Sequence, residues 1–490
     1  MNDAASAEVS ANKRLGEWLA VFGAASVFIA NAAAIISGID RISAQLSEWL
    51  DDLALAFGRT VATLIVAPLA VIVYGVAAYL IYRNWIAQRE RLWRLAFWIV
   101  VATGATIPVM TTVLALRSGD SSEQVAELDR NFAHDLLRQQ YSSGPFAGGV
   151  RFSTSDSSDV AQPWTTAQTL VALEQSRQAR ASTAEIAGGI RYLLANQTAK
   201  GGWGYMVGLA SDVAEVNAWS ARALIMSLVP QAGAPTWTDP EKARIHGAAL
   251  RALGELAQTQ MTSGAWSPIL ECRSPRNART YSTIMAISAF TEARRTKLFS
   301  PAEIASFDDV VKRAAAFVLG AYRDESARSG WWPNPLERSP TGDYPGLTAQ
   351  TLLVLEEAGQ AFPVLRGDPR LAAMIAAQLT RANVANQYRP ALSGRSISEN
   401  DQPHDMESYL DACNVGTAES STFLWYPWTL ALAATAAADK DLPIPVQRQA
   451  GKMLRSLTPR LGELQRFANQ NEAVYPTAEA LLAIAFLKPS

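Results

Sequence analysis

A short motif that recurs at nearly even spacing constrains this chain more than any other feature. The motif is a glutamine, three residues, a glycine, one residue and an aromatic residue, as in Gln197-Gly201-Trp203. The glycines of its copies lie 57, 63 and 66 residues apart, and a hydroxyl residue that begins an apolar segment follows each copy. The copies are Gln140-Gly144-Phe146, Gln197-Gly201-Trp203, Gln260-Gly264-Trp266 and Gly330-Trp332, and the hydroxyl residues are Thr166, Ser220, Ser282 and Thr348. Units of this kind cannot bury their apolar faces alone, so they must stack on one another.

The segments between the motifs alternate between two patterns. One set is almost wholly apolar, which is typical of an inner ring of helices: 165–177, 217–229, 279–294, 347–359, 427–438 and 476–487. The other set carries charge on one face, which is typical of an outer ring: 121–141, 184–197, 241–259, 305–322, 369–384 and 444–460. Helical periodicity of both kinds predicts an all-α fold. Six inner and six outer helices predict a closed (α/α)6 toroid over residues 124–490.

The Gln-x3-Gly-x-Trp motifs resemble the QW repeats of the terpenoid cyclase and protein prenyltransferase superfamily. The resemblance covers roughly residues 121–490. It implies an α/α toroid with an apolar central cavity, and a ligand that is an isoprenoid or another lipid-like amphiphile.

Two catalytic signatures that the resemblance implies are incomplete. No Asp-x-Asp-Asp acid is present, and the zinc-ligand spacing Asp411-Ala412-Cys413 has no histidine after it. His404 lies nearby, so a site built from His404, Asp411 and Cys413 remains an alternative, although zinc binding needs a fuller set of ligands. We therefore predict no cofactor and no metal. Whether the chain is an enzyme stays open.

Candidate site residues come from the loops that lead into the inner helices and from their first turns. Carbohydrate-active toroids use carboxylates beneath aromatic platforms, so the loop acids Asp343, Asp411 and Glu419 are the candidate catalytic groups. A charged side chain in an apolar lumen is costly unless paired or hydrated, so it marks either a polar binding spot or a tie between helices. The candidate ligand-binding residues are Gln168, Arg222, Gln350, Glu479, Trp266, Trp332 and Tyr344.

Residues 1–117 have a different composition. They contain three uncharged segments of 22 or 23 residues, each long enough to cross a bilayer of roughly 30 Å as a helix: 18–39, 60–82 and 95–116. The sequence thus predicts three transmembrane helices, followed by a linker at 118–123. The distribution of Lys and Arg around them favours a multi-pass protein of the cell membrane with an extracytoplasmic, periplasmic toroid. Small residues in these segments favour a homo-oligomer.

Charge and cysteine content narrow the remaining functions. The formal net charge is −2, and no basic run or phosphate-binding loop is present, so we expect no nucleic-acid partner. Two cysteines, Cys272 and Cys413, are too few for a disulfide framework. Free thiols are the favoured state, and a single bridge remains an alternative.

Three functions remain. The first is a membrane-anchored toroid that binds an amphiphilic ligand in its central cavity. The second is a non-catalytic membrane sensor, effector or scaffold whose toroid binds a ligand or partner and controls the transmembrane helices. The third is a carbohydrate-active hydrolase or lyase. A polar insertion at 386–421 predicts a flap over one mouth of the toroid, because loops of this length are usually functional or disordered.

Overall fold

The computed structural model describes residues 120–490 except for one long gap and several short ones. The gaps are 154–159, 209–210, 231–234, 325–328, 333–334, 336–343, 363–364, 366–367, 385–424, 459–460, 462–473 and 488–490. The chain divides into two compact units, 1–119 and 120–490, and the first lies wholly outside the described residues. The insertion at 386–421 lies outside them too. The predicted domain boundaries at 117 and 124 stay predictions.

The three predicted membrane spans, 18–39, 60–82 and 95–116, also lie outside the described residues. Within the described part of the chain, no helix combines the length and the apolar composition that a membrane span requires. The prediction of a multi-pass membrane protein with an extracytoplasmic toroid is corrected on this finding. The structure supports a helical toroid over residues 120–490, and the predicted membrane partner and membrane-mediated oligomer have no support in it.

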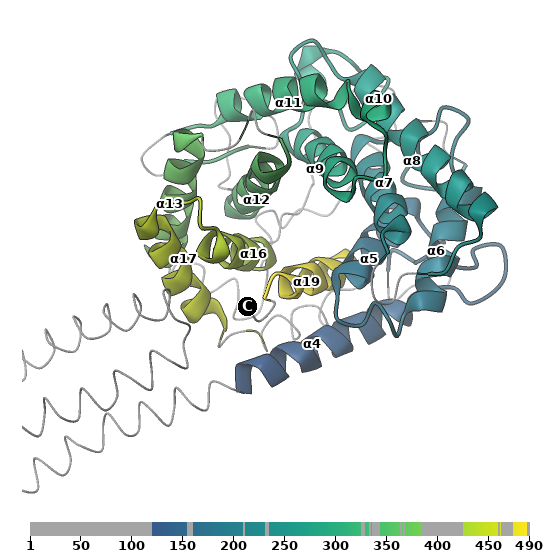
Figure 1. Ribbon diagram of the computed structural model, residues 1–490, viewed down its shortest axis with the longest axis horizontal. Coiled ribbons are helices and arrows are strands. Elements are labelled where there is room, and N and C mark those ends of the chain that lie inside the picture. The colour runs from purple at the N-terminus through teal and green to yellow at the C-terminus, as the bar shows by residue number, and fades with distance from the viewer. Residues whose placement is uncertain are drawn as a thin grey trace, which may run out of the picture. The chain divides into compact units, whose positions relative to one another are not determined.

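The described helices form two concentric rings (Figure 1). The inner ring consists of α5 (Pro163–Gln175), α7 (Ala214–Leu228), α9 (Thr280–Thr296), α12 (Pro345–Ala361), α16 (Trp425–Ala438) and α19 (Tyr475–Ala485). The outer ring consists of α4 (Asp120–Leu137), α6 (Thr183–Ala195), α8 (Asp239–Thr259), α11 (Phe307–Ala321), α13 (Pro369–Val384) and α17 (Ile444–Leu457). Two short helices, α10 (Pro301–Ile304) and η2 (Pro275–Asn277), lie in connections. The predicted toroid of alternating inner and outer helices is confirmed.

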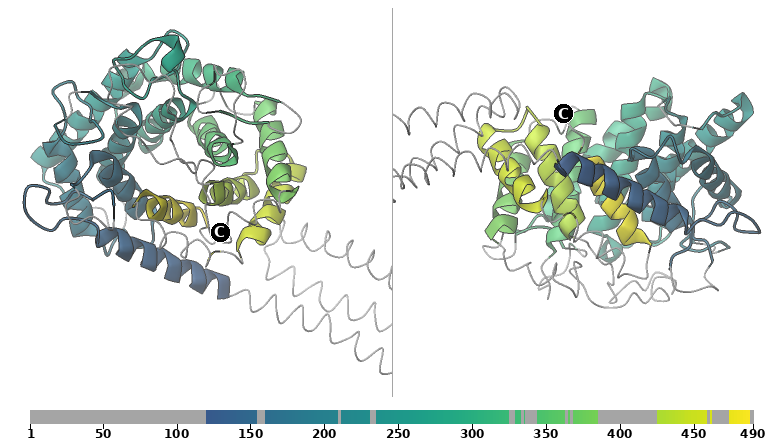
Figure 2. Two further views of the ribbon diagram at one scale, coloured as in Figure 1. Left: turned by 180° about the vertical axis from the view of Figure 1, so that it is seen from behind. Right: turned by 90° about the horizontal axis from the view of Figure 1, so that it is seen from below.

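The ring closes on itself. Each inner helix packs against the next, and the last one, α19, packs against both α5 and α4. Figure 2 shows α4 crossing beside α19. The backbone N–H of Val474 donates a hydrogen bond to the carbonyl oxygen of Phe152 at 2.8 Å, so the end of the chain is joined to its first loop. Every inner helix therefore has two inner neighbours.

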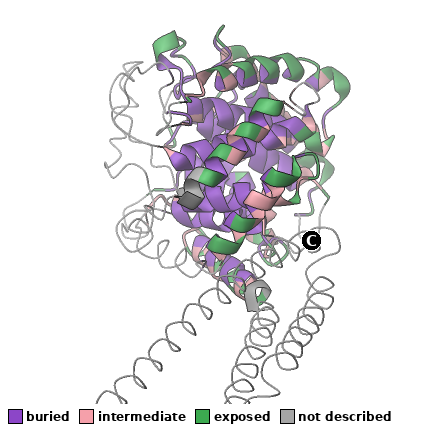
Figure 3. Ribbon diagram, turned by 90° about the vertical axis from the view of Figure 1, so that its left-hand side faces the viewer, coloured by how far each residue is buried: buried purple, intermediate pink, exposed green. Residues whose placement is uncertain are grey.

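Burial follows the sequence pattern of each ring (Figure 3). In α5 every residue except the last is buried, and α7 and α12 are similar. The outer helix α8 buries one stripe only, at helical spacing: Ile245, Ala248, Ala249, Ala252, Leu253, Glu255 and Leu256. A wholly apolar helix needs partners on all sides, and an amphipathic helix covers it from outside.

The glutamine of the repeat joins successive outer helices. Gln197, which follows α6, donates through Nε2 to the carbonyl oxygens of Gly201 at 2.7 Å and of Ala248 in α8 at 2.9 Å. The same pair of bonds recurs from Gln140 to Gly148 and Glu185, and from Gln260 to Gly264 and Val310. A buried carbonyl must find a donor, and the glutamine amide supplies two.

The tryptophan of the repeat fixes each loop to the preceding outer helix. Its indole Nε1 donates to a helix carbonyl oxygen: Trp203 to Leu193 at 2.8 Å, Trp266 to Leu256 at 2.8 Å and Trp331 to Val318 at 2.6 Å. The backbone N–H of the residue at the tryptophan position also donates a hydrogen bond. Its acceptor is the side chain of the fourth residue of the following inner helix. The acceptors are Thr166 (from Val150), Asn217, Thr283 and Thr348.

These bonds correct the predicted register at four places. Gly148, with φ +84°, takes the place assigned to Gly144, because the first copy has four extra residues. Trp331 takes the place assigned to Trp332. Asn217 and Thr283 take the places assigned to Ser220 and Ser282, since a side-chain amide or a hydroxyl can accept the same bond.

A glycine substitution tests whether the loop must lie this close to the outer helix. Gly264 has φ +92°, and a Cβ there would lie 2.3 Å from the carbonyl oxygen of Arg313. Gly264→Ala should therefore lower the free energy of unfolding by roughly 2–4 kcal/mol, measured by urea denaturation. The control is Gly254→Ala within α8, where a Cβ meets nothing within 4 Å. It should raise the free energy of unfolding by about 0.5–1 kcal/mol. Equal urea midpoints for Gly264→Ala and the wild type would contradict the close approach.

Candidate functional site

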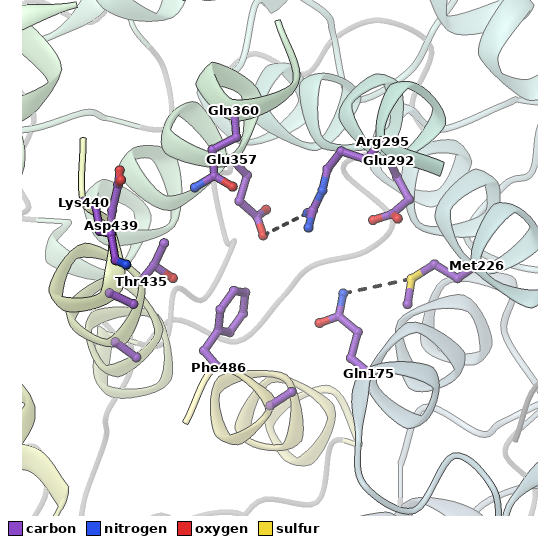
Figure 4. A pocket seen from close by; sticks show the side chains of 13 residues that line it. Gln175, Met226, Glu292, Arg295, Glu357, Gln360, Thr435, Asp439, Lys440 and Phe486 are labelled. Carbon is purple, nitrogen blue, oxygen red and sulfur yellow. Dashed lines mark hydrogen bonds and ion pairs between the residues drawn. The ribbon is translucent and has the colours of Figure 1, made fainter. Parts of the chain in front are cut away.

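The C-terminal ends of the inner helices surround a cavity of about 560 Å³, called here the mouth cavity. All six inner helices contribute lining residues, either from their last turns or from the residues directly after them (Figure 4). The lining residues are Gln175, Met226, Glu292, Arg295, Glu357, Gln360, Ala434, Thr435, Ala438, Asp439, Lys440, Ala485 and Phe486. Closure of the ring thus gathers side chains that lie hundreds of residues apart in the chain.

A smaller niche of about 20 Å³ extends from the mouth cavity into the lumen. Gln175, Glu357 and Phe486 line both spaces, and the niche adds residues from earlier turns of the inner helices. The added residues are Trp219, Arg222, Met285, Ser288, Gln350, Leu353, Val354, Trp428 and Leu482. Its volume suits about one water-sized group.

Glu357 is the acid that faces both spaces. Its Oε1 lies 3.7 Å from Nη1 of Arg295, and its side chain is 18% exposed. Burial raises the pKa of Glu357 above its usual value, and Glu292 raises it further. The guanidinium groups of Arg222 and Arg295 counteract part of this pKa shift. Glu357 therefore keeps its proton to a higher pH than an exposed glutamate.

Two more acids at this end of the toroid have raised pKa values. Burial, together with the hydrogen bond and charge of Asp439, raises the pKa of Glu356 to about 8. Burial, with a smaller contribution from the charge of Glu292, raises the pKa of Glu174 well above its usual value. The carbonyl ends of the surrounding helices also disfavour negative charge here. This end of the toroid therefore holds several carboxyl groups that keep their protons to a higher pH than exposed carboxyl groups do.

The predicted lumen residues divide between a helix tie and the niche. Glu479 of α19 accepts hydrogen bonds from Nε1 of Trp428 in α16 at 2.9 Å and from Nε2 of Gln168 in α5 at 3.4 Å. The structure thus brings Gln168 and Glu479 together as a tie between three inner helices where the ring closes. Burial raises the pKa of Glu479 to about 8.

Arg222 and Gln350 are the other two residues of that register, and both line the niche. The guanidinium carbon of Arg222 lies 4.9 Å from the ring centre of Trp219. Nε2 of Gln350 lies 3.8 Å from Sδ of Met285. Trp428, which donates to Glu479, lines the niche as well, so the tie and the niche adjoin one another.

The predicted aromatic platform lies at the other ends of the inner helices. Trp266 has no exposed surface, because its ring packs beneath the repeat loop. Trp332 is buried as well; Arg323 lies 5.4 Å over its ring, and its carbonyl oxygen accepts a bond from Thr280 at 2.6 Å. Tyr344 directly precedes α12. The structure brings none of these three residues to the mouth cavity, and their binding role stays a prediction.

The predicted catalytic acids Asp343, Asp411 and Glu419 lie outside the described residues, as do the weak zinc candidates His404 and Cys413. Among the residues that are described, no group of three His, Cys, Asp or Glu side chains could hold a metal ion. Cys272 is buried and disulfide-bonded, so the expectation of a free thiol is wrong for this residue.

Sequence reasoning missed Glu292, Arg295, Glu357 and Asp439. The predicted site residues came from the loops that lead into the inner helices and from their first turns. These four residues lie at or just beyond the C-terminal ends of those helices. A signal was available, because the last turns of two otherwise apolar helices both carry charge: Glu292 to Arg295 in α9, and Glu356 and Glu357 in α12.

Comparisons with known proteins yield structural neighbours alone. No family model and no curated protein sequence matches the chain. It is similar to an inactive variant of the α-1,6-mannanase GH76A of Salegentibacter sp. HEL1_6 in complex with α-1,6-mannotriose, with a TM-score of 0.50, 8% identity, and coverage of 74% of this chain and 98% of that one. Rex8A from Paenibacillus barcinonensis with xylose matches with a TM-score of 0.44, 10% identity, and coverage of 76% and 94%. At such identities, the mannanase likeness establishes the toroid fold alone.

The neighbours correct the resemblance to terpenoid cyclases and protein prenyltransferases. The fold of the chain is similar to that of an α-1,6-mannanase, so the prediction of a prenyltransferase-like, cyclase-like or lipid-binding protein is wrong. The motif misled because its glutamine and tryptophan hold helices together. It carries no information about the reaction or the ligand.

The raised pKa of Glu479 predicts how the free energy of unfolding changes with pH. Because its folded pKa, about 8, exceeds the usual 4.5, the folded state holds a proton that the unfolded state has released. This contribution to stability is complete below about pH 4.5 and declines as the pH rises to about 8. Glu479→Gln keeps a neutral side chain and should remove that decline in urea unfolding measured from pH 5 to 9. A variant whose stability declines over this range as steeply as that of the wild type would refute a protonated Glu479.

Proposed function

We propose that the toroid is a carbohydrate-active enzyme that hydrolyses a glycosidic bond in the mouth cavity. The observation that carries this proposal is the pair of carboxyl side chains, Glu357 and Glu292, that project into one cavity with Arg295 beside them (Figure 4). Burial raises the pKa of Glu357, which is what a proton donor in this reaction requires. The likeness of the fold to a mannanase agrees with this proposal.

The chemistry needs one proton donor and one carboxylate. Glycosidases protonate the leaving oxygen with an acid whose pKa is raised, while a second carboxylate activates water or attacks the sugar. Glu357 suits the first role, because burial keeps its proton in place. Glu292 suits the second. In a hydrolytic cycle Glu357 gives its proton to the glycosidic oxygen, and Glu292 accepts one from the attacking water.

The rest of the cavity suits a hydroxylated ligand. Its volume of about 560 Å³ lies within the usual range for small-molecule sites. Gln175, Gln360, Thr435 and Lys440 offer donors or acceptors to sugar hydroxyls, and Phe486 supplies an aromatic surface. This mixture favours a sugar over the lipid-like ligand of the first sequence-based hypothesis.

The proposal predicts a large loss of activity when Glu357, the proton donor, is replaced by a residue that cannot donate a proton to the leaving oxygen. In the full-length protein, Glu357→Gln should lower kcat/KM for oligosaccharide hydrolysis by roughly 10²–10⁴-fold, because the amide cannot protonate the leaving oxygen. Activity is measured as reducing ends released from a panel of manno-, xylo-, gluco- and uronic-acid oligosaccharides.

The control variant is Glu303→Gln, which changes an acid on α10 outside the mouth cavity and should leave the rate unchanged. If the wild type releases no reducing ends from any member of the panel, the proposal fails. It also fails if Asp343→Asn or Glu419→Gln abolishes hydrolysis while Glu357→Gln does not, since the reaction would then take place elsewhere.

A further inference from the structure

Arg222 is a buried cation that shares the acid Glu357 with Arg295. It is 8% exposed, and its Nε has no hydrogen-bond partner among the described residues. Its neighbour on one side is the ring of Trp219. An arginine stays charged throughout the pH range in which proteins are folded, and a buried charge is costly unless something pairs with it. The position of Arg222 in the niche therefore points to an anionic partner from outside the chain.

The surroundings of Glu357 indicate where that anion would lie. The charges of both Arg222 and Arg295 act on its carboxyl group, so two guanidinium groups serve one acid. Lys440 adds a third cation to the lining of the mouth cavity. Glu292, which lies beside Arg295, and Asp439 line the same cavity and repel anions, so a second carboxylate needs direct contact with the guanidinium groups (Figure 4).

We propose that the ligand of the mouth cavity is an acidic saccharide whose carboxylate is bound by Arg222 and Arg295. This inference rests on the proposed function in taking the ligand to be a saccharide. The sugar ring fills the mouth cavity beside Gln360 and Phe486, and its carboxylate lies between Arg295, which lines the mouth cavity, and Arg222, which lines the niche. A uronic acid unit has this chemistry.

A carboxylate fits the niche better than the other anionic groups that sugars carry. A guanidinium group forms two parallel hydrogen bonds with the two oxygens of a flat carboxylate. A sulfate or phosphate carries additional oxygens in tetrahedral directions, and each of these would need a donor of its own in a niche that is lined mostly by apolar side chains. We therefore assign a carboxylate.

Calorimetric titration of the full-length protein tests the assignment. The probes are oligosaccharides of galacturonic and glucuronic acid, their carboxyl-reduced neutral counterparts, and sulfated and phosphorylated monosaccharides. The wild type should bind one acidic oligosaccharide at least about tenfold more tightly than its neutral counterpart, and added salt should weaken that binding. Arg222→Gln should weaken it roughly 10- to 100-fold and abolish the preference, because a charge-assisted bond to the ligand is lost.

Two further variants keep the test decisive. Arg295→Gln changes a half-exposed side chain that should not impair folding, and it should weaken acidic binding in the same way. Arg294→Gln is the matched control on the same helix, since Arg294 lies 3.6 Å from Asp308 of the outer ring and does not line the cavity. It should leave binding unchanged.

The outcomes separate this inference from the proposed function. Equal affinity for acidic and neutral oligosaccharides overturns the inference, as does equal or tighter binding of the sulfated or phosphorylated sugars. Hydrolysis of neutral oligosaccharides that depends on Glu357 but not on Arg222 or Arg295 also overturns it, and leaves the proposed function intact. Acidic binding that requires both arginines, without hydrolysis, supports the inference and refutes the proposed function.

Discussion

The toroid depends on a pair of side-chain hydrogen bonds to helix backbones. In the second and third repeats, a glutamine amide joins the loop to the next outer helix, and a tryptophan indole joins it to the preceding one. The bonds are additional to those of the helix backbone, since the carbonyl oxygen of Leu193 also accepts the backbone N–H of Asn196. The same bonds recur along the chain, and the ring closes where α19 packs against α5 and α4. The mouth cavity exists only because closure brings six helix ends together.

The helices could be predicted from the sequence because each obeys a local rule, but the register of the repeat could not be predicted in full. Spacing cannot show that the first copy contains extra residues before Gly148, or that an amide at Asn217 replaces a hydroxyl. The candidate site was harder still. Glu292 and Glu357 lie 65 residues apart, and each by itself is typical of a solvated helix end. Their common cavity is a property of the closed ring.

The resemblance to the prenyltransferase superfamily failed for a related physical reason. Its motif describes how a loop is attached to two helices, which is a requirement of the architecture. Chemistry depends on which side chains line the cavity, and those positions vary independently of the ties. Trp266 illustrates the separation: its buried indole donates to the carbonyl oxygen of Leu256, which is a structural role, while its binding role stays a prediction.

Closing a ring of apolar helices around acidic side chains raises the pKa values of those acids, and the effect serves a structural residue and a candidate catalytic one. Glu479 and Glu357 both lose water when the ring forms, and burial raises the pKa of each. Both oxygens of Glu479 accept hydrogen bonds from neighbouring helices, and the residue is 5% exposed, so Glu479 joins helices and its proton is out of reach of a ligand. Glu357 is 18% exposed and faces a cavity beside two guanidinium groups, so its proton is within reach of a ligand. Access to the cavity, and not the raised pKa, distinguishes a structural acid from a candidate catalytic one.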